Sequence, residues 1–217
     1  MTQRLGKSIN WGVSYTFSKA LGTAPNDGFT VATFFSPRVW NYGVLTHDRT
    51  QVLAINYNWK LPFDRNILVK GWQLSGITRG QTGAPFTPGY TLVNGADITG
   101  SGSQGARLVV ADPTAPVETR FRAPARGEVG NLGTNTLRHP GFLNFDVSIY
   151  RDMKFERVTT TLRFETYNTF NHTQYSAVSV NTRWDGAGST VQTDPLFLEP
   201  VSARTPRRIQ LALQLRW

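Results

Sequence analysis

Hydrophobic and polar residues alternate strictly in the first extended segment of the chain. Within residues 8–18, large apolar side chains from Ile9 to Phe17 take every second position, with small or polar residues between them. Successive side chains of a strand point to opposite faces. This segment therefore predicts a strand with one aromatic and aliphatic face and one polar face.

The same two-residue period recurs at five further places. It is clear in residues 52–59, 143–150, 162–165 and 208–217 and weaker in residues 71–80. The six predicted strands are near the roughly 9–11 residues that a tilted strand needs to cross a bilayer. Their charged residues fall on the polar face. This matters because Arg or Lys at mid-bilayer on a lipid-facing position costs roughly 2–4 kcal/mol.

The connections between the predicted strands alternate in length. Residues 19–49, 81–141 and 171–206 are long connections, whereas residues 62–66 and 152–156 are short ones. Structureless loops of that length are unusual in a compact soluble domain. In an outer-membrane barrel, short periplasmic turns and long extracellular loops are expected. Residues 30–35 and 85–93 are weaker candidates for additional strands.

The composition supports an all-β chain. The sequence has 217 residues, 12% aromatics, 20 Gly, 12 Pro and no Cys, and no apolar stretch approaches the ~18 residues of a membrane helix. The net charge of +9 is spread along the chain, which fits lipid phosphates and gives no clustered nucleic-acid site. No signal peptide is visible at the N-terminus.

Taken together, these patterns predict an antiparallel transmembrane β-barrel segment, with about six to eight strands of a larger barrel. An open sheet in lipid would leave unpaired backbone groups at its edges. We therefore expect the chain to be a fragment. The main alternative is a soluble all-β binding module, such as a lectin-like sandwich with a basic face, which would bury its aromatic face against a second sheet. An enzyme on a β scaffold is a third possibility, and no motif favours it.

Short motifs follow one another in order along nearly the whole chain. They are residues 15–20 (YTFSKA), 47–49 (HDR), 61–63 (LPF), 71–76 (GWQLSG), 81–86 (QTGAPF), 130–133 (GNLG), 140–142 (PGF), 164–165 (FE), 168–175 (NTFNHTQY) and 207–213 (RRIQLAL). With these motifs the chain resembles the C-terminal barrel of TonB-dependent outer-membrane receptors. The most similar subgroup, often called Oar-like, carries a carboxypeptidase-regulatory-like N-terminal domain.

The resemblance implies a barrel of about 22 strands with a plugged lumen that imports a solute with energy from the TonB complex. The plug, the TonB-contacting segment and most of the barrel would lie outside residues 1–217. Expected partners are outer-membrane lipid and lipopolysaccharide, the remaining barrel and plug, TonB and the barrel-assembly machinery. The last strand also looks like the signal read by that machinery, carried by its apolar positions: Ile209, Leu211, Leu213, Leu215 and Trp217. A last strand with an interfacial aromatic is the simpler alternative.

No catalytic residue, cofactor site or metal site is predicted. Residues 100–105 fit a dinucleotide motif literally, but no helix is expected after them. The three histidines lack a second ligand at zinc-like spacing. Asp146, Arg163 and Glu165 fall on neighbouring polar faces and predict a charge network on the lumen side. Aromatic residues near strand ends suggest membrane-interface girdles. Phe34, Phe35, Trp40 and Tyr42 are weaker candidates for sugar stacking.

Overall fold

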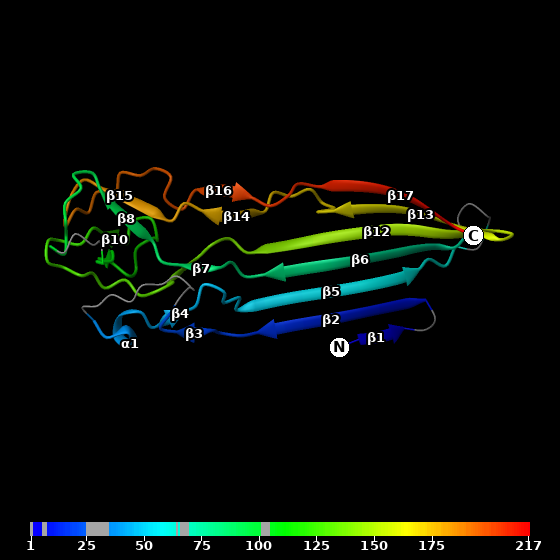
Figure 1. Cartoon of the computed structure of the whole chain (residues 1–217), viewed down its shortest axis with the longest axis horizontal. Coiled ribbons are helices and arrows are strands. Elements are labelled where there is room, and N and C mark those ends of the chain that lie inside the picture. Colours follow the sequence, from blue (N-terminus) through cyan, green and yellow to red (C-terminus); the bar gives the residue numbers. More distant parts are fainter. Residues whose placement is uncertain (1, 6–7, 25–34, 64, 66–69, 101–104) are drawn as a thin grey trace.

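A seven-stranded antiparallel sheet, called the main sheet below, forms the body of the protein in a computed structural model. The structure describes residues 2–5, 8–24, 35–63, 65, 70–100 and 105–217. Neighbouring strands follow the order β1-β2-β5-β6-β12-β13-β17, and Figure 1 shows them side by side along the long axis. Their bounds are β1 Thr2–Leu5, β2 Ile9–Phe17, β5 Gln51–Lys60, β6 Trp72–Gln81, β12 Phe142–Phe155, β13 Val158–Tyr167 and β17 Arg208–Arg216.

The strand register aligns the predicted faces across six strands. One row of paired residues is wholly apolar: Ile9, Trp59, Leu74, Ile149, Phe164 and Leu211. The next row is wholly polar: Asn10, Asn58, Ser75, Ser148, Glu165 and Gln210. Directly paired residues point to the same side of a sheet. The predicted apolar and polar faces are therefore confirmed as continuous surfaces.

The apolar face lies open. Leu211 is 73% exposed, Phe17 68% and Leu213 64%, and within the described ranges no second sheet packs on this face. A lectin-like sandwich would cover such a face, so the sandwich alternative is not supported. The only strand paired with β17 in this part of the chain is β13, and β1 pairs only with β2. The sheet is therefore open at β1 and β17.

Differences from the predicted strands lie mainly at their ends. The expected short link at residues 152–156 mostly belongs to β12, which runs to Phe155. The turn is only Glu156 and Arg157, with Glu156 at a φ of 48°. Strand β1 was missed, because its four residues are too short to show the two-residue period.

The long connections fold together into what we call the loop cap (residues 18–24, 35–50, 82–100, 105–141 and 168–207), at one end of the main sheet in Figure 1. It contains five two-stranded sheets: β3 Leu21–Gly22 with β4 Gly43–Val44, β7 Pro85–Phe86 with β11 Leu137–Arg138, β9 Val109–Val110 with β10 Phe121–Arg122, β14 Tyr175–Val178 with β16 Pro200–Ala203, and β8 Gly89–Leu92 parallel to β15 Asn181–Trp184. The long connections are present as predicted, and they carry short strands of their own.

The candidate strand at residues 85–93 is present as β7 and β8, but both lie in the loop cap and not in the main sheet. Most of the candidate at residues 30–35 lies outside the described residues. A short helix, α1 Pro37–Trp40, precedes β4. No helix in the part of the chain that the structure describes is long and apolar enough to cross a membrane.

The hydrophobic core lies in the loop cap. Trp184 is 1% exposed and Leu108 is fully buried, and the Trp184 indole donates a hydrogen bond to Thr182 Oγ1 at 2.7 Å. The core comprises Leu92, Ile98, Ala106, Leu108, Phe121, Ala123, Leu132, Trp184 and Phe197. These residues come from the second and third long connections. The two loops therefore stabilise each other by burying a shared apolar interior.

Candidate functional site

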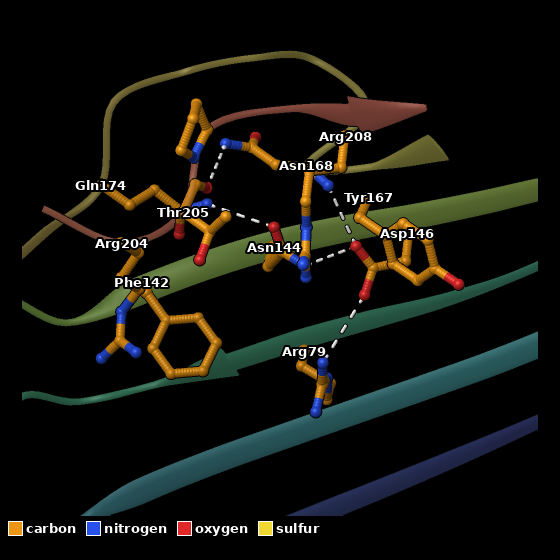
Figure 2. Close-up of a pocket in the computed structure, with 11 residues that line it drawn as sticks. Arg79, Phe142, Asn144, Asp146, Tyr167, Asn168, Gln174, Arg204, Thr205 and Arg208 are labelled. Atoms are coloured by element: carbon orange, nitrogen blue, oxygen red, sulfur yellow. Dashed lines mark hydrogen bonds and ion pairs between the residues drawn. The ribbon is translucent and has the colours of Figure 1, made fainter. Parts of the chain in front are cut away.

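The polar face of the main sheet ends at the loop cap in a hollow of about 260 Å³. One of its lining residues is Asp146 of β12, whose side chain is 17% exposed. Asp146 Oδ1 accepts hydrogen bonds from Asn144 Nδ2 at 2.7 Å and from the backbone N of Asn168 at 3.0 Å. Its other oxygen, Oδ2, lies 3.5 Å from Arg79 Nη2 of β6, as Figure 2 shows. The carboxylate thus ties two strands to the turn after β13.

That turn begins with two asparagines in the left-handed region. Asn168 has a φ of 53° and Asn171 a φ of 51°, a conformation that Asn tolerates better than most residues. Between them, Thr169 Oγ1 donates to the Phe145 carbonyl at 2.9 Å, and the Phe170 ring meets Phe145 edge to face at 5.1 Å. The turn is therefore held against β12 by both polar and apolar contacts.

Gln174 closes the far side of the hollow. It is 8% exposed. Its Oε1 accepts from the Leu143 backbone N at 3.1 Å, and its Nε2 donates to Asn144 Oδ1 at 3.3 Å. Asn168 Nδ2 donates to the carbonyls of His172 and Thr205. These bonds use side-chain amides to satisfy the backbone where the strands stop pairing.

Two arginines flank the hollow on aromatic rings. The guanidinium of Arg204 lies 4.2 Å from the centre of the Phe142 ring, and that of Arg208 lies 5.7 Å from Tyr167. Cation–π contact of this kind holds a guanidinium in place. Among the described residues, neither arginine has a carboxylate within ion-pair distance. Both are exposed and available to a solute.

The predicted charge network divides into two separate pairs. Arg163 Nη1 lies 3.6 Å from Glu165 Oε1 within β13, whereas Asp146 pairs with Arg79. No hydrogen bond or ion pair joins Asp146 to Glu165 in the described ranges, although both line a second hollow on the same face. Arg79 was not predicted as part of this network. Its position on the polar face of β6 is the signal that could have identified it.

The predicted assembly signal lies along the apolar face of β17 and just beyond it. All five of its side chains are exposed by 53–95%: Ile209, Leu211, Leu213, Leu215 and Trp217. The hollow is also lined by Arg204, Asn168 and Gln174. The two-residue period did not predict these residues, because they lie in irregular segments.

The tripeptide at residues 47–49, one of the family-like stretches, has a structural explanation within the loop cap. Asp48 is 2% exposed and accepts hydrogen bonds from Arg138, Thr50 and the backbone N of Ala20. Burial raises the pKa of this carboxyl, but these hydrogen bonds, Arg138 first, outweigh burial and hold the pKa below its usual 3.8. We call this cluster the Asp48 latch, because it joins the first and second long connections.

The other sequence candidates are placed in the packing of the loop cap. His139 stacks on Phe86 at 4.5 Å, and burial lowers its pKa. Phe35 stacks on Trp40, which also contacts the Arg107 guanidinium at 4.5 Å. No group of three or more metal-ligating side chains occurs among the described residues. Phe34 and residues 101–104 of the dinucleotide motif lie outside them, and residues 109–110 that follow form a strand.

Comparison with known proteins gives one family. The model of the family described as outer membrane beta barrel domain matches residues 1–210. No curated protein and no solved structure matches the chain.

Proposed function

The chain belongs to the outer membrane beta barrel domain family, and we propose that it forms part of the wall of a TonB-dependent receptor that imports an unidentified solute. The protein is located in the outer membrane. Its apolar face therefore contacts lipid and lipopolysaccharide, and its polar face borders the lumen. The short turn after β12 is periplasmic, and the loop cap is extracellular.

The observation that carries this proposal is the loop cap with its own hydrophobic core. Trp184 and Leu108 are buried at the extracellular end, so the long loops form one folded surface there. A folded extracellular surface above a polar lumen wall suits capture of a solute before uptake. The order of the family-like motifs, including 168–175 at the hollow, supports the same assignment.

Further partners follow from this proposal. The open edges at β1 and β17 would pair with the remaining strands of the barrel, which would enclose a plug that contacts TonB. The exposed apolar side chains at the end of the chain, including Leu213 and Trp217, would be bound by the barrel-assembly machinery. No residue is assigned a catalytic role.

Two measurements on the full-length receptor test the proposal without knowledge of the solute. In planar bilayers, a plugged receptor should show no stable conductance until urea unfolds the plug. In a pull-down, the purified periplasmic domain of TonB should bind the receptor. A large open conductance without urea, together with no TonB binding, would instead identify a passive pore.

A further inference from the structure

We infer that the hollow beside Asp146 binds a carboxylated sugar unit of the imported solute; this inference rests on the proposed transport role. The hollow is lined by three arginines, Arg79, Arg204 and Arg208, and by one carboxylate, Asp146. Its lining combines residues of the polar face of β6 and β12 with residues 204–206 of the loop cap, so it lies where the lumen-side face meets the cap. A solute that has passed the loop cap would meet it next.

The free arginines indicate an anionic ligand. Several arginines of the loop cap use their guanidinium groups internally: Arg107 donates to the carbonyls of Trp40 and Leu132, and Arg138 binds Asp48. Arg204 and Arg208 have only an aromatic ring each among the described residues. A guanidinium stacked on a ring keeps its N–H edge available, and that edge matches a carboxylate through two parallel hydrogen bonds.

The remaining lining residues indicate hydroxyl groups on the same ligand. Asp146 is a hydrogen-bond acceptor in the hollow, and Thr205 adds a neutral polar group. A ligand that carried only negative charge would be repelled by Asp146. A ligand with a carboxylate at one side and hydroxyls at the other would bind the arginines and donate hydrogen bonds to the remaining lone pairs of Asp146.

The size of the hollow limits what it holds. A volume of about 260 Å³ is below the roughly 300–1,000 Å³ of pockets for drug-sized ligands. It therefore suits one sugar ring of a longer chain. An acidic oligosaccharide presents such a ring, with its carboxylate and hydroxyls on one compact frame.

The test is binding of trigalacturonate to the purified full-length receptor by titration calorimetry, with its methyl ester as an uncharged probe of the same shape. We expect the acid to bind and the ester to bind at least about tenfold more weakly, because charge-assisted hydrogen bonds are lost. The double variant Arg204→Gln/Arg208→Gln should weaken binding of the acid by a similar factor.

The control matched to the Arg208→Gln change is Arg216→Gln, which removes one positive charge from the same strand and face. Arg216 lies eight residues from Arg208, or roughly 26 Å along a strand, so the affinity should stay within about twofold. A second variant, Arg204→Lys/Arg208→Lys, keeps the charge but loses the paired geometry and should give an intermediate affinity. Heat-modifiable gel migration checks that each variant is folded.

Equal binding of acid and ester, no binding of either, or an unchanged affinity in the double glutamine variant would overturn the inference. The proposed transport role would still stand if the same preparation bound the TonB domain and gave no open conductance. If the receptor bound trigalacturonate but gave an open conductance and did not bind the TonB domain, the sugar site would be supported and the TonB-dependent mechanism would be contradicted.

Discussion

Apolar side chains lie on the surface of the main sheet and in the interior of the loop cap. Leu211 in β17 is 73% exposed, whereas Leu108 in the loop cap is fully buried. The two regions belong to one chain, but they face different solvents. Lipid accepts the apolar face of the sheet without a protein core. Water outside the membrane forces the long loops to bury theirs.

The two regions are held together by different interactions. The main sheet depends on backbone pairing along whole strands, since hydrocarbon offers no other hydrogen-bond partner. The loop cap has strands of two to four residues, too short for pairing alone to fix them. Its order comes from the shared core and from buried polar contacts such as the Asp48 latch.

Trp184→Ala should have the largest effect, and only on the loop cap. Loss of this buried indole should cost about 3–5 kcal/mol. Limited proteolysis of the receptor in detergent should show much faster cleavage in residues 82–141 and 171–206. The main sheet should keep its heat-modifiable migration. Trp184→Phe is the control and should retain more protection from cleavage. If Trp184→Ala were cleaved as slowly as wild type, the stabilising role of the core in the loop cap would be contradicted.

Leu211→Arg should damage only the main sheet. A charge near mid-bilayer on the lipid face should cost about 2–4 kcal/mol and lower the amount of folded receptor in outer-membrane fractions. The adjacent Gln210→Arg places the same charge on the polar face opposite Glu165 and should leave that amount unchanged. Equal losses for both variants would contradict the assignment of the two faces.

Asp48→Asn should loosen the loop cap by a smaller amount. It removes the charge that binds Arg138 and leaves a buried amide poorly matched to its donors, at a cost of about 1–3 kcal/mol. Hydrogen exchange in residues 18–24 and 43–50 should rise. Glu128→Gln, in the more exposed pair with Arg122, is the control and should change protection little.

Acidification from pH 7 to pH 5 should have a smaller effect than any of these substitutions and should leave the Asp48 latch intact. The pKa of Asp48 is lower in the folded protein than its usual 3.8. Its contribution to stability is therefore complete above about 3.8 and is lost only as the pH falls through the lower folded value. Hydrogen exchange near Asp48, corrected for its intrinsic pH dependence, should be constant from pH 7 to 5. A loss of protection near pH 5 would contradict this.

Much of the main sheet could be predicted from the sequence, because a strand between lipid and a lumen must alternate at every position. The row from Ile9 to Leu211 follows directly from that period. The end of β12 could not be predicted in the same way. Arg151 interrupts the apolar positions between Ile149 and Met153, and the tight turn depends on the left-handed conformation of Glu156.

Six of the seven strands of the main sheet, their two faces and the alternation of short and long connections could be predicted from the sequence, since these depend on local side-chain period and length. The loop cap, the Asp48 latch and the hollow around Asp146 depend on tertiary contacts. Their partners lie far apart in the sequence, as Arg138 does from Asp48 and Arg204 from Phe142. Such contacts carry no period, because they form only when irregular segments fold against one another.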